Sequence, residues 1–167
     1  MVVAGIDGST KNTGISLMKD SELILHVLIS LPKEKDPMKR IPQMLLKICE
    51  VLDQYEIDEV RMEKAFNKQN VKTTMQLANV AGGVMMYCAQ KGIKFIHPEP
   101  SVWRKDVGLE QGRGINRETL KAEAIKAVKE IYGVDEGDDV AESILICRSA
   151  FGLPKINITE DDLWDTN

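Results

Sequence analysis

The first part of the chain alternates short apolar segments with polar turns, a pattern typical of consecutive β-strands. Residues 1–9 form a nearly continuous run rich in valine and isoleucine, which favours a central strand. A second strand is expected to begin at residue 15, after a turn at residues 11–14, and a third is expected over residues 21–31. Three strands joined by short turns predict an antiparallel β-meander.

The remainder of the chain changes to a helical period interrupted by short apolar runs. Residues 37–55 place Ile41, Met44, Leu45 and Ile48 at helical spacing. Further strands are expected over residues 57–63 and 92–97, and further helices over residues 73–90, 117–132 and 138–150. Strands separated by helices pair in parallel, so we predict an α/β domain whose mixed five-stranded sheet is flanked by helices.

Length and composition favour one cytoplasmic domain. The 167 residues are enough for a single hydrophobic core, which we place at residues 1–155, with an acidic C-terminal tail at residues 156–167. Cys49, Cys88 and Cys147 are far apart in the sequence and lack a nearby histidine cluster, which favours free thiols in a reducing cytoplasm. No signal peptide and no bilayer-spanning stretch is recognisable, so we expect no membrane association.

The charge distribution is uneven along the chain. The protein as a whole has a net charge of −4, but residues 61–126 carry +6, between segments of −3 and −7. A basic middle on an acidic chain is compatible with phosphate binding, because partner choice depends on the local field. An unevenly charged, solvated surface explains the same numbers equally well.

Four acidic residues lie where a sheet and a helix could bring their side chains together. Asp7 and Glu63 end two expected strands, and open α/β sheets place ligands at such carboxyl ends. Asp139 and Glu142 are three residues apart and share one face of the last helix. Clustered carboxylates repel one another unless a divalent cation neutralises them, and oxygen ligands favour Mg²⁺, with Mn²⁺ able to substitute. Two such ions can hold the attacking water and the leaving oxygen of a phosphodiester.

Each of these acids also has a structural interpretation. Asp7 can bind the amides of the turn that follows it, and Glu63 can be a surface residue at a strand end. Either Asp138 or Asp139, together with Glu142, fits a helix capping box. The joint occurrence of the four acids favours the metal site, while the choice between Asp138 and Asp139 stays open.

Four stretches of the chain resemble one nuclease family in order and spacing. They are AGIDGSTKNTGISL, VRMEKAFNKQNVKTTMQLANVAGGV, FIHPEPSVWRKDVG and GDDVAESILI. The chain resembles the RuvC Holliday-junction resolvases, and among these the divergent bacteriophage members. The resemblance implies an RNase H-like fold, a homodimer, and Mg²⁺-dependent nicking of branched DNA such as four-way junctions, with no nucleotide cofactor. For a phage-encoded member the compartment is the host cytoplasm.

The same resemblance implies roles for individual residues. Asp7, Glu63, Asp139 and Glu142 match the family's catalytic and metal-binding acids. The family usually has aspartate at the last of these positions, so Glu142 is a departure whose longer side chain can shift a metal or change the metal preference.

Other matches concern DNA. Phe66 matches an aromatic residue that stacks on bases near the junction centre, and ordinary packing under the next helix is its alternative. Lys105 and Lys121 match lysines near the scissile phosphate, where an ammonium group stabilises developing charge, although a solvated helix lysine is as good an interpretation of Lys121. Six further basic residues are expected to contact phosphates, each with plain surface charge as its alternative: Lys64, Lys68, Lys72, Arg104, Arg113 and Arg117.

Three rival functions are open to test. The GIDGST segment also resembles the phosphate-binding turn of actin-like and sugar-kinase-like ATPases, but the chain is too short for their second lobe. A nuclease of the YqgF type, acting on RNA or junctions, would share the fold. A non-catalytic module for branched DNA would bind without nicking, and the presence of all four acids argues against lost catalysis.

Overall fold

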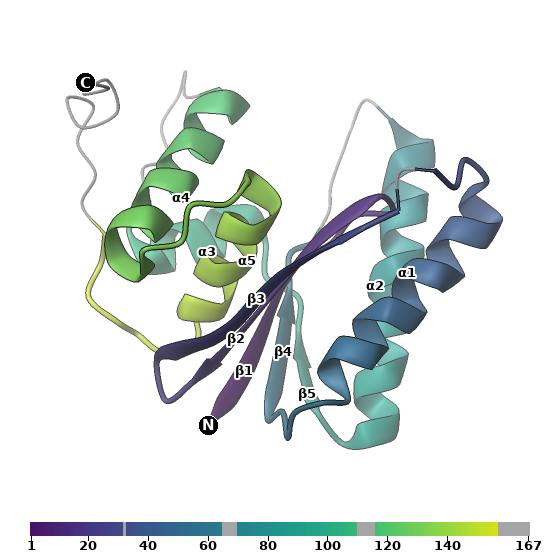
Figure 1. The fold of residues 1–167 in the computed structure, drawn as a ribbon, viewed down its shortest axis with the longest axis horizontal. Coiled ribbons are helices and arrows are strands. Elements are labelled where there is room, and N and C mark those ends of the chain that lie inside the picture. The colour runs from purple at the N-terminus through teal and green to yellow at the C-terminus, as the bar shows by residue number, and fades with distance from the viewer. Residues whose placement is uncertain (32, 65–69, 110–115, 157–167) are drawn as a thin grey trace.

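The computed structural model describes residues 1–31, 33–64, 70–109 and 116–156. Five strands and five helices lie within these ranges (Figure 1). The strands are β1 (Val2–Asp7), β2 (Asn12–Lys19), β3 (Glu22–Ser30), β4 (Glu59–Met62) and β5 (Lys94–Ile96). The helices are α1 (Pro37–Leu52), α2 (Val71–Lys91), α3 (Pro100–Val107), α4 (Arg117–Tyr132) and α5 (Asp138–Arg148). None of these helices combines the length and the hydrophobicity needed to cross a lipid bilayer.

The strands form one mixed sheet in the order β3-β2-β1-β4-β5. The β1–β2 and β2–β3 pairs are antiparallel, whereas β1–β4 and β4–β5 are parallel. Figure 1 shows α1 and α2 on one face of the sheet and α3, α4 and α5 on the other. The prediction of a mixed five-stranded α/β domain is therefore confirmed, as is the β-meander that opens it.

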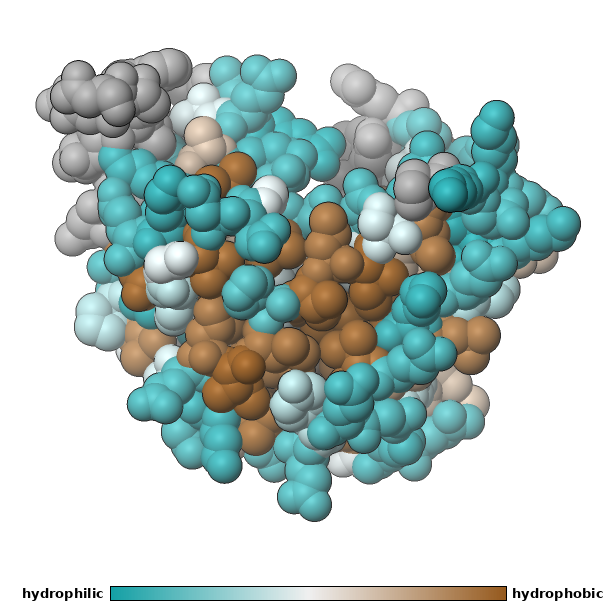
Figure 2. All heavy atoms as spheres, in the orientation of Figure 1, coloured by the Kyte–Doolittle hydropathy of each residue, from teal (hydrophilic) through white to brown (hydrophobic). Residues whose placement is uncertain are grey.

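Two hydrophobic cores lie on the two faces of the sheet. Ala4 and Ile6 of β1 pack with α1 and α2, while Val3 packs with α4 and α5. A strand buried on both faces needs apolar residues at nearly every position, which explains the continuous run at the N-terminus. At the outer edge of the sheet, Ile24 and Leu28 of β3 remain exposed, and Figure 2 shows apolar side chains gathered between the two helical layers.

Helix α5 approaches the sheet unusually closely because glycines face it. A Cβ atom at Gly5 of β1 would overlap the carbonyl oxygen of Ser143, and one at Gly14 of β2 would overlap that of Asp139. A hydrogen bond also joins β2 to α5, because Ser16 Oγ donates to the Ser143 carbonyl oxygen over 2.7 Å. The helix is buried from Val140 to Arg148, so its acidic first turn has a fixed place against the ends of β1 and β2.

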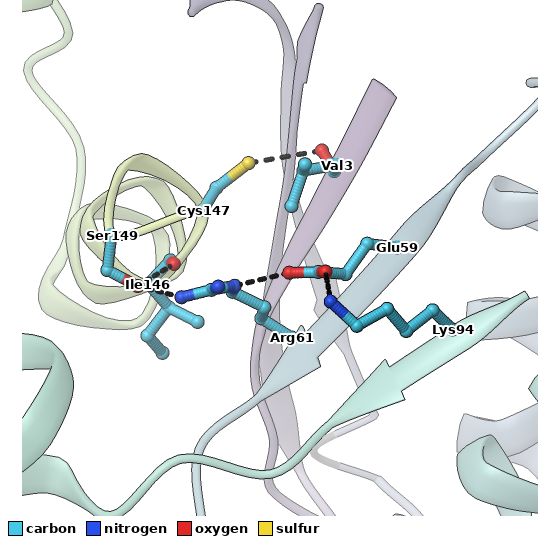
Figure 3. A network of polar contacts seen from close by, with 7 residues as sticks. All are labelled: Val3, Glu59, Arg61, Lys94, Ile146, Cys147 and Ser149. Atoms are coloured by element: carbon cyan, nitrogen blue, oxygen red, sulfur yellow. Dashed lines mark hydrogen bonds and ion pairs between the residues drawn. The ribbon is translucent and has the colours of Figure 1, made fainter. Parts of the chain in front are cut away.

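A polar network fixes the other end of α5 (Figure 3). Glu59 at the start of β4 accepts hydrogen bonds from Arg61 Nε and from Lys94 Nζ of β5, each over 2.6 Å. Arg61 Nη1 in turn donates to Ser149 Oγ over 3.0 Å, directly after α5. The carboxylate is buried but doubly paired, which offsets the cost of removing it from water. The network therefore ties β4, β5 and α5 together at the end of β4 opposite Glu63.

Two local features differ from the sequence-based expectations, and a further residue extends the core. Helix α3 was not predicted, although Pro100 in its first turn and the left-handed Gly108 after its end are typical helix boundaries. Strand β2 already begins at Asn12, because the preceding turn is closed earlier by Ser9, whose Oγ accepts from the amides of residues 11 and 12. The core includes Ile156, which is buried and whose amide donates to the Val107 carbonyl over 2.7 Å. The boundary placed at residue 155 stays a prediction, since residues 157–167 lie outside the described residues.

Candidate active site

The carboxyl ends of β1 and β4 meet at one edge of the sheet. Ile6 pairs in parallel with Met62, so the residues that follow, Asp7 and Glu63, lie side by side at the strand ends. The Glu63 amide continues the pairing by donating to the Ile6 carbonyl over 3.2 Å. Neighbouring parallel strands thus deliver two carboxylates to the same place, where open α/β sheets bind ligands.

A cleft of about 780 Å³ opens above this edge. Its walls come from the β1–β2 turn, from α1, α2 and α4, and from the starts of α3 and α5. All four acids predicted from the sequence line it: Asp7, Glu63, Asp139 and Glu142. The structure therefore brings together side chains that are up to 135 positions apart in the chain.

The acids repel one another in this cleft. Burial raises the pKa of Asp7 well above that of an ordinary aspartate, and the charges of Glu142, Glu63 and Asp139 raise it further. The Asp7 and Glu142 carboxyls also share a hydrogen bond, which favours the protonated form of Asp7. Burial likewise raises the pKa of Asp139 and Glu63. Such a group of carboxylates requires a cation to be fully ionised at neutral pH.

Helix α3, absent from the sequence-based prediction, holds two of the acids. Trp103 is fully buried, and its Nε1 donates to Glu63 Oε2 over 2.6 Å, which opposes the rise in the pKa of Glu63. The next residue, Arg104, forms an ion pair with Glu142 through Nη2, and its guanidinium carbon lies 4.4 Å from the centre of the Trp103 ring. The boundary residues Pro100 and Gly108 are the signal that could have revealed this helix.

The donor set fits a hard divalent cation, because four carboxylates line one cleft and oxygen ligands suit Mg²⁺ or Mn²⁺. As they stand, however, no three His, Cys, Asp or Glu side chains in the described residues converge tightly enough to hold one ion. Glu142 is turned to Arg104, and Glu63 to Trp103. The charge and the donor chemistry are therefore present, while the ligand geometry requires these two side chains to adjust.

The alternative of a capping box at the last helix has no support in the geometry. Helix α5 begins after Gly137, and no side chain caps its first turn. Asp138 forms an ion pair with Lys121 of α4 at the cleft wall, whereas Asp139 acts on Asp7 through space. The two neighbouring aspartates thus have different partners, and Asp139 is the one coupled to the carboxylate cluster.

The basic residues predicted from the sequence have varied positions. Arg117 lines the cleft, and Lys64 is exposed beside it in an ion pair with Glu99 over 2.6 Å. Lys72 is exposed on α2, and Lys105 is exposed on α3 without lining the cleft. Three of the predicted DNA contacts fall outside the described residues: Phe66, Lys68 and Arg113.

One arginine of the cleft was missed. Arg40 is buried on α1, where its Nε and Nη2 donate to Thr10 Oγ1 over 3.2 and 3.0 Å and its Nη1 donates to the Glu34 carbonyl over 2.9 Å. It fixes the β1–β2 turn that forms one wall of the cleft. Its place directly before Ile41, on the apolar face of the predicted helix, was a signal for a buried cation.

Comparison with known proteins places this architecture in context. The family model described as "Crossover junction endodeoxyribonuclease RuvC" matches residues 3–145. A crossover junction endodeoxyribonuclease RuvC of Nitratidesulfovibrio vulgaris is 26% identical over 148 residues, covering 86% of this chain and 89% of the relative.

Two solved structures share the fold. T. thermophilus RuvC in complex with a Holliday junction substrate has a TM-score of 0.70 at 17% identity, covering 90% of this chain and 93% of its own. The fowlpox virus resolvase in complex with substrate Holliday junction DNA has a TM-score of 0.57 at 16% identity, covering 89% and 97%. These likenesses confirm the RNase H-like fold that the sequence resemblance implied.

Proposed function

Since this chain belongs to the RuvC family of crossover junction endodeoxyribonucleases, we propose that it binds branched DNA, four-way junctions above all, and nicks it by metal-dependent hydrolysis. The observation that carries the proposal is that β1, β4 and α5 place four carboxylates in one cleft: Asp7, Glu63, Asp139 and Glu142. A site built only to bind the DNA backbone would not concentrate carboxylates there, because they repel phosphate.

We propose Mg²⁺ as the physiological metal, with Mn²⁺ able to replace it. Asp7 would be one ligand, and Glu63, Asp139 and Glu142, which line the same cleft, would complete the ligand set. A bound pair of ions would supply an activated water and stabilise the leaving oxygen. The protein itself supplies fixed carboxylates in a partly closed cleft.

The DNA backbone would be held by basic side chains on the cleft walls and rim. Arg117 and Lys11 line the cleft, and Lys64 and Lys72 lie exposed on segments next to it. We propose that these residues contact phosphates and position the duplex arms without reading sequence. On the strength of the family match, we propose that Phe66 stacks on bases and that Lys68 and Arg113 contact phosphates.

A homodimer would suit a junction with two equivalent strands to cut. Helix α2 carries an apolar stripe at alternating spacings of four and three, formed by Val71, Met75, Ala78, Gly82, Met85 and Ala89. Val71, Met75 and Met85 are each more than half exposed, as is the adjacent Met86, and a Cβ at Gly82 would meet no atom of the same chain. This heptad pattern is typical of a helix that packs against a second helix, so we propose that α2 pairs with its copy.

The proposal is tested by incubating the protein with labelled four-way, three-way and linear duplex DNA, with Mg²⁺, with Mn²⁺ and with chelator. We expect metal-dependent nicks in the branched substrates and little cutting of the linear duplex. Preferential cutting of RNA hairpins would instead favour a nuclease of the YqgF type. Tight junction binding without any metal-dependent nicking would identify a non-catalytic module and contradict the proposed function.

A further inference from the structure

Arg104 is a cation inside a cleft whose proposed role is to bind other cations. Its side chain is 9% exposed, pairs with Glu142 and stacks on the buried ring of Trp103. Arginine remains charged at any pH that a folded protein tolerates. In this structure it therefore neutralises Glu142, one of the four carboxylates, at the position where a metal ligand is expected.

The hydrogen bonding of Arg104 is incomplete. Nη2 binds Glu142, but Nη1 is buried and has no hydrogen-bond partner among the described residues. Buried donors in a structural arginine are normally satisfied, as those of Arg40 are by Thr10 and a backbone carbonyl. An unused donor at the wall of a cleft that takes up DNA is suited to an incoming phosphate oxygen.

The pairing also explains why the carboxylates share a cleft without forming a finished metal site. Glu142 bonds to Arg104 and to Asp7, so its oxygens are occupied. We propose that Arg104 is a positioning residue that acts as an internal counter-cation: it holds Glu142 while the cleft lacks divalent metal, and it releases Glu142 when metal binds. The freed guanidinium then faces the DNA phosphate. The inference deepens the proposed function and rests on it.

If Arg104 has this role, its removal changes the metal affinity in the opposite direction from that expected for a merely structural residue. A side chain that competes with metal for Glu142 weakens metal binding by the free energy of the pairing. Removing it must therefore strengthen metal binding and, at the same time, destabilise the metal-free protein, because the carboxylates lose their counter-charge. If Arg104 only supports the shape of the site, its removal weakens metal binding instead.

The experiment measures Mn²⁺ affinity in the full-length chain without DNA. Trp164→Phe leaves Trp103 as the sole tryptophan, and its bond to Glu63 makes its emission a reporter of the carboxylate cluster. Arg104→Gln is compared in this background with Arg117→Gln. The control removes the same residue type and the same charge from the same cleft, but Arg117 acts on Glu63 and Asp139 only through space. Thermal unfolding in chelator and in excess Mn²⁺ gives a second readout.

We expect Arg104→Gln to bind Mn²⁺ at least about fivefold more tightly than the parent, the lower end of a typical coupling between two sites. Arg117→Gln should gain clearly less. In chelator the unfolding temperature of Arg104→Gln should fall, and excess Mn²⁺ should restore it. If Arg104→Gln does not fold, Arg104→Lys takes its place in the test. Lysine keeps the charge but lacks the planar guanidinium, so Arg104→Lys should still bind Mn²⁺ more tightly than the parent.

Unchanged or weaker Mn²⁺ binding in the Arg104 variants, or an equal gain in Arg117→Gln, would overturn the inference. The proposed function survives that result as long as the parent protein binds metal and nicks junctions. A parent protein that does not bind Mn²⁺ at all contradicts both, so the two failures are distinguishable.

Discussion

Gly14 lies against the backbone of Asp139, so close that a methyl group on residue 14 would overlap the Asp139 carbonyl oxygen. Gly14 is also the cross-strand partner of Asp7. The missing side chain on β2 thus sets how near the first turn of α5 comes to the carboxylate at the end of β1. The geometry of the cleft depends on this contact as much as on the acids themselves.

Gly14→Ala should therefore push the start of α5 away from β1 and impair the site. Overpacking of this kind costs about 1–3 kcal/mol of folding free energy. A shift of the catalytic groups of about 1 Å can reduce the rate of nicking on the order of 100-fold. Urea unfolding and single-turnover nicking of a four-way junction measure the two effects.

Gly137→Ser is the control for Gly14→Ala. It adds a side chain at the start of the same helix, where a Cβ meets no other atom within 4 Å and serine is a favoured cap. Equal losses in the two variants would show that α5 is sensitive to any change at its start, and not to the contact with Gly14.

The metal-free protein should lose stability as the pH rises, and Asp7→Asn should reduce that loss. Burial and mutual repulsion raise the pKa values of Asp7, Glu63 and Asp139 in the folded state. Between the unfolded pKa, roughly 4, and the raised folded value, the native protein holds protons that the unfolded chain has released, so the free energy of unfolding falls with increasing pH.

Asp7→Asn removes the carboxyl group at the centre of this repulsion. In chelator at about pH 8 we expect the variant to be more stable than the parent by about 1 kcal/mol, and at about pH 5 the difference should shrink. Nicking should be abolished while junction binding is kept. A variant that still nicks DNA would remove Asp7 from the mechanism, and one that is less stable at the higher pH would contradict the repulsion.

The carboxylates of the site could be predicted from the sequence because simple geometry controls them. Asp7 and Glu63 end neighbouring parallel strands, and Asp139 and Glu142 share a helix face, so periodicity and strand order suffice. The surroundings could not be predicted in this way. Arg104 was expected to contact a DNA phosphate, with plain surface charge as the alternative, but it is buried against Glu142. The two residues are 38 positions apart, and only the packing of α3 against α5 brings them together.

Helix α3 escaped prediction for a related reason. It is eight residues long, and the helix is stabilised mainly by burying Trp103 and Val107 against other elements. A local pattern of two apolar residues is too short to distinguish it from a loop. The two contacts that hold Glu63 and Glu142 were therefore missed together.

The apolar stripe on α2 predicts how the proposed dimer can be broken. Met86→Glu places a carboxylate at the edge of the exposed stripe, where Met86 is 59% exposed, so the monomer should fold normally. Sedimentation should show a shift from dimer to monomer. On a cruciform plasmid, paired cuts that linearise the DNA should give way to single nicks.

Met38→Glu is the matched control for Met86→Glu. Met38 is 79% exposed at the start of α1, outside the stripe, and a carboxylate in a first helical turn is favourable. The control should remain dimeric and linearise the plasmid. If Met86→Glu also stays dimeric, the α2 face is not the interface.

Lys121 and Lys105 should affect different steps of the reaction. Neither lysine lines the cleft itself, but Lys121 pairs with Asp138, which does, whereas Lys105 is exposed on α3. Lys121→Ala should slow single-turnover nicking of saturated junction DNA by about 100-fold, as expected for loss of a charge that stabilises the transition state. Lys105→Ala should leave that rate nearly unchanged, weaken binding, and reduce the slope of log affinity against log salt by about 1, as expected for the loss of a single phosphate contact. A slow nicking rate for Lys105→Ala at saturating DNA would instead require α3 to turn this side chain toward the scissile phosphate when DNA binds.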